Sequence, residues 1–341
     1  MQELQLNRCE RCGKEAKIFL GYGPHRFCKE HFNDFFEKRV KRTIRQSKMI
    51  SYGEKIAVGV SGGKDSMVTL HLLNKLLGNQ NKIEVIMIDE GIKGYRDKSM
   101  QVGIKYCKEN GIPYHAVAYE KELGVDMEGV FKKIQQDEKL GSTCGFCGVF
   151  RRQFLNSKAL EIKADKLATG HNLDDEVQSI AMSLFGNQLA RIASLGEIAG
   201  VKKHDKFVPR IKPLYETPEK EIISYAAFNG IEHYSAECCP YSWMAKRNHY
   251  RKMINELEES VPGTKYSILS TFRELKPMLV QKELEKEPQF SQCEKCGSPC
   301  RGIVCNVCIQ LEKLEKMQPQ KKVSKSLKKK SKLTCIDTKN M

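Results

Sequence analysis

Residues 59–68, GVSGGKDSMV, place two adjacent glycines, a lysine, an aspartate and two serines directly after an apolar run. In such a turn at a helix start, main-chain N–H groups and the helix dipole favour a bound phosphate. The common pattern G-x-x-x-x-G-K-[ST] does not fit, because the segment is one residue short and Asp65 follows Lys64. We therefore predict a different kind of phosphate site, whose closest ligands are Ser61, Gly62, Gly63 and Ser66.

A second polar stretch, residues 169–178 (TGHNLDDEVQ), follows another predicted strand. His171, Asp174 and Asp175 come after Gly170 at the start of a predicted helix. Carboxylates at that position cap the helix. If they face the glycine loop across the sheet edge, they could instead hold magnesium or activate a nucleophile.

Cysteines at both ends of the chain have the spacing of zinc modules. Each group has two close pairs of ligands that a hairpin can bring into a closed tetrahedral shell. In the second group Cys300 could replace one partner, although we favour the two symmetric pairs. The predicted ligands are Cys9, Cys12, Cys28 and His31 for the first zinc ion, and Cys293, Cys296, Cys305 and Cys308 for the second.

A third group of cysteines has no partner pair nearby. Cys144 and Cys147 form a C-x-x-C before a predicted helix, and Cys238 and Cys239 come much later in the chain. These thiols could bind zinc, form a redox dithiol, or hold an iron–sulfur cluster with one iron left open. The spacing does not choose among the three, and the remaining lone cysteines are Cys107 and Cys335.

Strands and helices alternate from Lys55 onward, and these elements must position the polar groups. KIAVGV, KIEVIMID, YHAVAY and DKLATGHN read as strands, with helical patterns between them. The alternation predicts an α/β fold with a doubly wound parallel sheet, in which ligands bind at the carboxyl ends of the strands. Asp89 ends the second of these strands and is placed to meet a ribose or an adenine.

Ahead of the sheet, KIFLGYGPHRF predicts two short strands around a Gly-Tyr-Gly turn. The helix that follows has an apolar stripe, and its other face carries basic residues. The stripe consists of Phe32, Phe36, Val40 and Ile44, and the basic residues are Lys38, Arg39, Lys41, Arg42, Arg45 and Lys48.

Composition predicts a globular protein, and its basic charge favours a polyanionic partner, nucleic acid first, over a merely solvated surface with a disordered lysine tail. Its 341 residues carry a net charge of +16, and the body stays basic without the lysine-rich end. No apolar run reaches the length of a membrane helix and the first residues lack a signal-peptide core, so we expect a cytoplasmic protein. We expect an N-terminal zinc finger (1–33), a basic linker helix (34–50), a catalytic domain (51–260), a helical connector (261–290), a zinc ribbon (291–318) and a disordered basic tail (319–341).

The motif SGGKDS resembles the PP-loop of ATP pyrophosphatases, which split ATP between the α- and β-phosphates and adenylate a substrate. Within that superfamily, the chain is similar to the tRNA 2-thiouridine synthases with flanking zinc modules. Their motifs are a C-x-x-C…C-x-x-H finger, SGGKDS, a central C-x-x-C, GHNxDDE, a later cysteine and a C-terminal C-x-x-C…C-x-x-C. All six occur here in order across residues 9–308.

The stretch CGFCGVFRRQFL further resembles the branch that thiolates the wobble uridine, position 34 of tRNA. The sister branch, which modifies uridine 54, tends to have a lysine where Arg151 stands. The chain size and the two zinc modules resemble the archaeal members of the family.

This resemblance implies roles for particular residues. Cys144, Cys147 and one of Cys238 and Cys239 would ligate a [4Fe-4S] cluster, and Cys239 matches the later family cysteine better. Asp175 would be the polar catalytic residue near the uridine. ATP and Mg²⁺ would bind at Ser61, Gly62, Gly63, Lys64, Asp65, Ser66, Asp89 and Gly170.

The implied reaction adenylates the C2 oxygen of the uridine and then replaces AMP with sulfur carried on the open iron. tRNA would be held by the basic helix 38–48, the zinc modules and the tail. The sulfur donor could be free sulfide, a persulfide or a ubiquitin-like thiocarboxylate protein, and the family often forms homodimers.

Three alternatives remain open from the sequence. The target could be uridine 54 instead of uridine 34. Another PP-loop adenylating enzyme, such as a lysidine-type synthetase or an amidotransferase, would leave the central cysteines without a role. A zinc-ribbon RNA-binding protein without enzymatic activity would leave the phosphate loop and its facing carboxylates unexplained.

Overall fold

The computed structural model describes residues 7–200, 206–235, 239–285 and 290–316. At its centre lies a six-stranded sheet in the order β5-β4-β3-β6-β8-β7, and all its pairings are parallel except that of β7 with β8. Its strands are β3 (Lys55–Gly59), β4 (Lys82–Asp89), β5 (Tyr114–Ala118), β6 (Lys166–Thr169), β7 (Ile198–Ala199) and β8 (Arg210–Ile211).

This sheet confirms the predicted fold class. The chain runs outward from β3 through β4 to β5 and then returns to place β6 on the other side of β3. The strand order therefore reverses between β3 and β6, and the carboxyl ends at such a point open a crevice for a ligand. Both the glycine loop and Gly170 follow these two strands.

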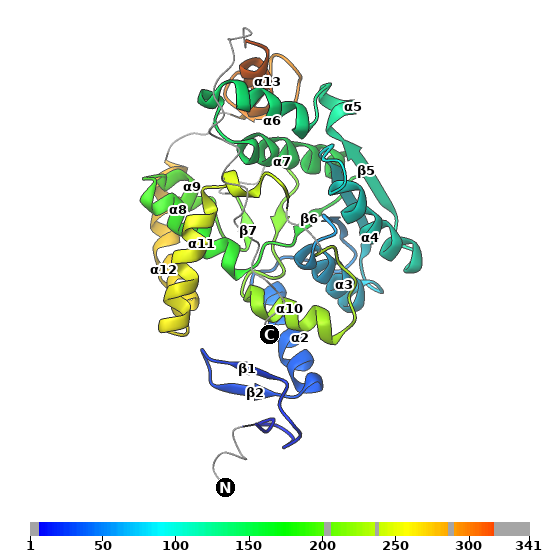
Figure 1. The fold of residues 1–341 in the computed structure, drawn as a ribbon, viewed down its shortest axis with the longest axis vertical. Helices are drawn as coiled ribbons and strands as arrows, with labels where there is room; N and C mark the ends of the chain where they lie inside the picture. The colour runs from blue at the N-terminus through cyan, green and yellow to red at the C-terminus, as the bar shows by residue number, and fades with distance from the viewer. Residues whose placement is uncertain (1–6, 201–205, 236–238, 286–289, 317–341) are drawn as a thin grey trace.

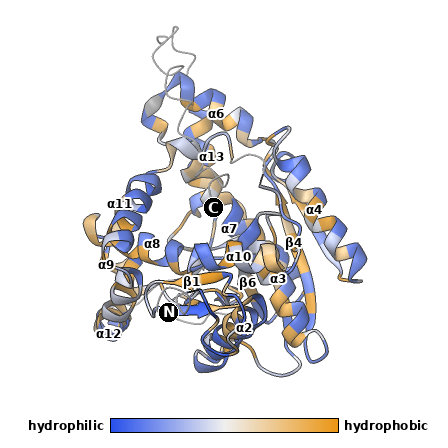
Figure 2. Ribbon diagram, turned by 60° about the horizontal axis from the view of Figure 1, so that its bottom comes forward, coloured by the Kyte–Doolittle hydropathy of each residue, from blue (hydrophilic) through white to orange (hydrophobic). Residues whose placement is uncertain are grey.

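Helices cover the sheet on both faces (Figure 1). Figure 2 shows hydrophobic residues along β4 and β6, between helices of mixed character, as expected for strands buried on both faces. The helices are α2 (Lys29–Gln46), α3 (Lys64–Leu77), α4 (Arg96–Glu109), α5 (Tyr119–Leu123), α6 (Met127–Gln136), α7 (Thr143–Glu161), α8 (Leu173–Phe185), α9 (Leu189–Ala193), α10 (Glu219–Phe228), α11 (Arg247–Ser260), α12 (Thr264–Leu284) and α13 (Asn306–Glu315).

The start of α7 differs from the sequence expectation. Cys144 and Cys147 were expected before a helix, but α7 begins at Thr143 and both cysteines lie in its first turns. Ser142 explains the earlier start, because its side chain accepts a hydrogen bond from the main-chain N–H of Gly145 and caps the helix. Both thiols are thereby fixed on a regular element.

The N-terminal module confirms the predicted hairpin. β1 (Ile18–Leu20) pairs antiparallel with β2 (His25–Phe27), and the apolar stripe of α2 is buried in the same hydrophobic core as β3 and α3. This module and the C-terminal cysteine module, which includes α13, lie at opposite ends of the molecule (Figure 1).

The basic face predicted for α2 needs a correction. Arg39 is only 6% exposed, and its Nη1 lies 2.9 Å from Oε2 of Glu221 while its Nη2 donates to the hydroxyl of Tyr22. Arg39 lies three residues after Phe36, so it shares the apolar face. It anchors the N-terminal hairpin to α10 and is not available to a polyanion.

The C-terminal module packs on α7. Its strands β9 (Phe290–Gln292) and β10 (Pro299–Arg301) form a hairpin before α13, and its cysteines share a hydrophobic cluster with Phe146 and Phe150 of α7. The predicted tail 319–341, with Cys335, lies outside the described residues. Within the described ranges, the helices lack a stretch both long and apolar enough to cross a membrane.

Candidate active site

The glycine loop connects β3 to α3 and is held by its own serines. The N–H of Ser61 donates to Oγ of Ser66 at 3.1 Å, and that hydroxyl lies 2.9 Å from the carbonyl oxygen of Gly63. Gly63 is the N-cap of α3 and provides no side-chain cap. The first N–H groups of α3 are therefore left for an anion, as a phosphate site requires.

Two glycines allow the close approaches that shape this loop. Gly62 has φ +82°, and a Cβ there would lie 1.8 Å from the carbonyl oxygen of Ser99. A Cβ on Gly170 would lie 2.8 Å from the main-chain N of Ser66. The end of β6 thus abuts the loop, and the two motifs predicted to meet are brought together.

Lys64 and Asp89 do not line the cavity beside the glycine loop. Nζ of Lys64 lies 2.6 Å from Glu219 and 3.1 Å from Asp65. The carboxylate of Asp89 accepts the N–H of Gly91 at 2.9 Å, and its chain neighbours, not Asp89 itself, line the cavity described next. The ribose or adenine role of Asp89 stays a prediction.

One cavity of about 470 Å³ brings the candidate groups together. It lies at the reversal point between β3 and β6, where the topology predicts ligand binding. Among its lining residues are Ser61, Asp65, Ser66, Glu90, Arg96, Cys144, Arg151, Gly170, His171, Asp175 and Arg247.

Asp175 has two relationships at the start of α8. It completes a capping box with Asn172, so Asp175 has the helix-capping role that the sequence also allows. Its Oδ1 also lies 2.5 Å from Nη1 of Arg247, at the start of α11. Burial opposes its charge, but His171 and Arg247 hold the pKa of Asp175 below its usual value. Asp175 is therefore a carboxylate at the cavity wall.

Asp174 and Asp65 differ in what they can offer a cation. Asp174 is buried, pairs with Lys265 and accepts the N–H of Glu219 at 2.8 Å, which makes it a link between helices. Asp65 lines the cavity, where Asn172 donates to its Oδ1 at 3.0 Å. Carboxylate oxygens of Asp65 and Asp175 fit the donor chemistry of Mg²⁺.

Cys144, Cys147 and Cys239 come together beside this cavity. Cys144 lines it, and burial together with the charges of Cys239 and Cys147 raises the pKa of Cys144 to about 11. Cys238 lies outside the described residues, so the structure does not choose between it and Cys239. The three roles predicted for this group stay predictions.

Among the described residues, the three central sulfurs do not form a close group of the kind found at the chain's two terminal cysteine modules. Tetrahedral ligands at a Zn–S distance of about 2.3 Å stand about 3.8 Å apart. Among the residues that the structure describes, only the two terminal groups bring three or more ligand atoms within 4.8 Å of one another. At least one pair of the three central sulfurs therefore stands farther apart than this, and three thiols are a donor set that suits an iron–sulfur cluster with one open iron.

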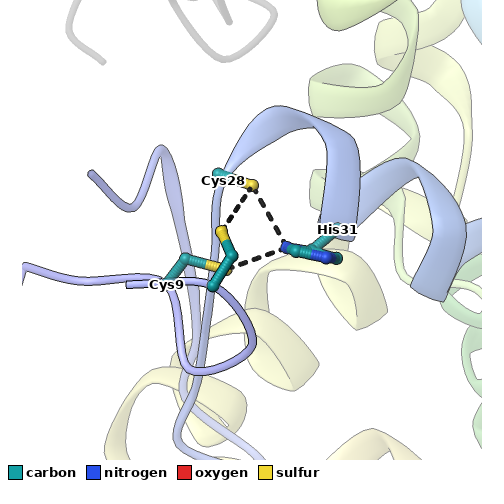
Figure 3. Close-up of side chains that lie close together, drawn as sticks. Cys9, Cys28 and His31 are labelled. Atoms are coloured by element: carbon teal, nitrogen blue, oxygen red, sulfur yellow. Dashed lines mark hydrogen bonds between the residues drawn. The ribbon is translucent and has the colours of Figure 1, made fainter. Parts of the chain in front are cut away.

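Both terminal groups have zinc-type geometry. Figure 3 shows the Sγ atoms of Cys9 and Cys28 converging on Nδ1 of His31, at 3.3 and 3.4 Å, and Sγ of Cys12 lies 3.8 Å from that of Cys28. Although burial opposes ionisation, main-chain N–H groups lower the pKa of Cys9 to about 6, which favours a thiolate ligand.

The C-terminal group consists of the two symmetric pairs favoured from the sequence. Sγ of Cys296 lies 3.6 Å from that of Cys305. Cys300 is not part of the group; its thiol donates to the carbonyl oxygen of Gly302 at 3.0 Å. The donor chemistry of both terminal groups fits structural Zn²⁺.

Several charged residues of the cavity were not predicted. Glu90 and Arg96 follow β4, and Arg247 comes from α11, far from the motifs in sequence. Glu90 follows the last residue of a parallel strand, which is a position where ligands bind, so this signal was available. Arg247 has no such signal, since its role depends on how α11 packs on α8.

A second cavity, also of about 470 Å³, lies between α3, α4 and the end of α10. It is lined by His71, Tyr106 and Asn229 with their neighbours, and the glycine loop and the central cysteines do not contribute to its described lining. The candidate chemistry therefore belongs to the cavity at the sheet edge.

Comparison with known proteins shows the family of the chain. The family of PP-loop domains matches residues 32–258. The tRNA 2-thiolation protein NcsA of Haloferax volcanii is 37% identical over 321 residues, which are 90% of this chain and 99% of that protein. The tRNA-5-methyluridine(54) 2-sulfurtransferase of Pyrococcus horikoshii is 36% identical over 301 residues, or 88% of this chain and 92% of that protein.

A solved structure shares the fold as well. The U34-tRNA thiolase NcsA from Methanococcus maripaludis, determined with its [4Fe-4S] cluster, aligns with a TM-score of 0.71 and 34% sequence identity. The alignment covers 80% of this chain and 88% of that one.

Proposed function

Because the chain belongs to the PP-loop family of tRNA 2-thiolation proteins, we propose that it is an ATP-dependent tRNA-uridine 2-sulfurtransferase. One observation carries the proposal: a single cavity is lined by the glycine loop, by Asp175 and by Cys144. A phosphate site alone would fit any adenylating enzyme. A thiol at the same cavity adds a reason to activate the substrate, namely to replace an oxygen with sulfur.

The proposed reaction has two halves. The C2 oxygen of the uridine attacks the α-phosphorus of ATP and pyrophosphate leaves; a sulfur nucleophile then attacks C2 and AMP leaves. The loop N–H groups would hold the pyrophosphate, where fixed dipoles stabilise the developing charge without reorganisation. Asp65 and Asp175 would hold Mg²⁺, and Asp175 would also orient the uridine.

Cys144, Cys147 and Cys239 would hold a [4Fe-4S] cluster with three ligands. When bound, that cluster supplies a thiophilic iron for the sulfur to be transferred. The chain's own contribution is to fix two of these thiols on the first turns of α7 and to place one at the cavity wall. The two terminal groups would hold Zn²⁺ and stabilise the modules that flank the catalytic domain.

We favour uridine 34 of tRNA as the target. The similarity to the U34-tRNA thiolase covers most of both chains, and Arg151 stands where the uridine 54 branch tends to have lysine. The relative named as a uridine 54 enzyme keeps the second target open to test. The sulfur donor would be sulfide, a persulfide or a ubiquitin-like thiocarboxylate protein. A homodimer is proposed by family resemblance.

The tRNA would lie along basic residues beside the cavity. Arg152, Arg191 and Arg210 have no carboxylate partner among the described residues, and desolvation with the charges of Arg210 and Arg191 lowers the pKa of Arg152. Arginines without a neighbouring carboxylate to neutralise their charge can bind the phosphates of RNA. On α2 the exposed Lys41 and Arg45 would add a weaker contact. A reducing cytoplasm suits the unpaired cysteines.

The test is pyrophosphate release from ATP by cluster-loaded protein, with and without tRNA. We expect tRNA to stimulate release, and Cys147→Ala to leave release at saturating ATP intact while it abolishes incorporation of sulfur. A small-molecule adenylating enzyme would ignore tRNA. Full sulfur incorporation by Cys147→Ala would overturn the proposed role of the central cysteines.

A further inference from the structure

A buried carboxylate, that of Glu90, lies between an arginine that contacts the glycine loop and an arginine that contacts Cys147. Glu90 directly follows β4 and is 3% exposed. Its Oε2 lies 2.7 Å from Nε of Arg96, and its Oε1 accepts hydrogen bonds from Nε and Nη2 of Arg151 at 3.1 and 2.8 Å. All three side chains line the cavity. Burying a carboxylate so completely is costly unless both of its partners stay in place.

Arg96 connects this carboxylate to the glycine loop. It begins α4 and is 2% exposed, and its Nη1 donates to the carbonyl oxygen of Ser61 at 2.6 Å. The N–H and the hydroxyl of Ser61 both contact the hydroxyl of Ser66. A shift of the Arg96 guanidinium would therefore move the groups that hold phosphate.

Arg151 connects the same carboxylate to the cysteine group. It lies one helical turn after Cys147 on α7, and its Nη2 also lies 3.2 Å from Sγ of that residue. A guanidinium can contact a carboxylate and a sulfur at once because its donors form a rigid fork, which a lysine ammonium lacks. Donors to a ligating sulfur tune an iron–sulfur centre.

The Arg96 side chain has two possible hydrogen-bond acceptors for the same N–H group. Nε of Arg96 donates to the carbonyl oxygen of Ile88 at 2.5 Å, so Oε2 of Glu90 accepts no hydrogen bond from any described residue. Arg96 thus has two acceptors within reach of one N–H group. Coupling between sites needs such an element with two alternative arrangements.

We propose that Glu90 is a positioning residue that couples nucleotide binding at the glycine loop to the cluster site at Cys147, through Arg96 and Arg151. The inference rests on the proposed function, since it assumes ATP at the loop and a cluster at the cysteines. Coupling of this kind is reciprocal: whatever the cluster does to nucleotide affinity, the nucleotide does to the cluster.

Titration calorimetry with the α,β-methylene analogue of ATP and Mg²⁺ tests the coupling on the full chain. In the wild type, we expect Kd to differ by about fivefold or more between cluster-loaded and cluster-free protein. In Glu90→Gln the two Kd values should become equal within about twofold, while both forms still bind the analogue. The electron paramagnetic resonance of the reduced cluster should respond to the analogue in the wild type only.

Glu84→Gln is the matched control. Glu84 lies on β4, the strand that Glu90 follows, and pairs with Lys55 and His115 outside the cavity. The ratio of Kd values in Glu84→Gln should therefore equal that of the wild type. If Glu90→Gln does not fold, Arg151→Lys provides the second variant and should also lose the ratio.

A wild-type ratio of one, or an unchanged ratio in Glu90→Gln and Arg151→Lys, would overturn the coupling alone. Failure of the wild type to bind the analogue at all would overturn the proposed function itself. The two failures are therefore distinguishable in the same titration.

Discussion

At the scale of single residues, the account depends on close approaches that only certain side chains permit. Gly62→Ala would place a methyl group against the Ser99 carbonyl. We expect this variant to weaken binding of the ATP analogue at least about tenfold, because the loop must open by roughly an ångström or more to relieve the contact and the new side chain would have a positive φ. Gly53→Ala is the control, since Gly53 has a similar φ of +78° but open space around its Cβ position. Equal binding by both variants would contradict the close-packed loop.

Cys107 provides a residue-scale test of which cysteines are structural. It is 1% exposed in the core, and burial raises its pKa to about 11. A group whose pKa is raised on folding contributes fully to stability below its unfolded pKa. That contribution is lost as the pH rises from the unfolded pKa through the folded pKa. Between pH 8 and pH 10, the wild type should therefore lose roughly 1–2 kcal/mol more unfolding free energy than Cys107→Ala.

Urea unfolding of both proteins at the two pH values measures this difference. Effects of all other titrating groups cancel between the two proteins. Parallel pH profiles would show that Cys107 ionises in the folded state and is not an ordinary core thiol.

At the scale of elements, α7 must hold two thiols at its N-terminus. Ser142 caps that end through the N–H of Gly145, at 3.2 Å. Ser142→Ala should cost about 1 kcal/mol of stability and lower the iron retained after reconstitution, whereas Ser142→Asp should keep both near wild type. Thermal unfolding and iron analysis provide the measurements. Wild-type iron retention in Ser142→Ala would mean that packing against the C-terminal module fixes the helix start without the cap.

Elements also mark the boundary of what the sequence could predict. The strand ends, the glycine loop and the terminal metal groups follow local rules of periodicity and ligand spacing, so they could be recognised without tertiary information. Arg39 was misplaced because its basic character outweighed its position three residues from Phe36, on the buried face. Glu90, Arg96 and Arg151 meet only once α4 and α7 pack against β4, and no spacing in the sequence encodes that contact.

At the scale of the whole molecule, the basic surface beside the cavity should decide how tRNA binds. Replacing Arg152, Arg191 and Arg210 with glutamine should weaken tRNA binding and reduce the slope of log K against log salt by about two. Lys41→Gln with Arg45→Gln, on the exposed side of α2, should change the slope by less than one. Filter binding at several salt concentrations gives both slopes. A larger change of slope in the α2 variant than in the triple arginine variant would indicate that RNA binds along the N-terminal module instead.

The central claim joins the cavity, the cysteines and the RNA into one activity. Its most direct test incubates cluster-loaded protein with ATP, Mg²⁺, sulfide and unmodified tRNA without oxygen, followed by mass spectrometry of the nucleosides and mapping of the modified position. The account predicts 2-thiouridine at position 34, dependent on ATP and absent with Cys147→Ala or Asp175→Ala. Thiolation confined to position 54, or no 2-thiouridine with any loaded preparation, would contradict it.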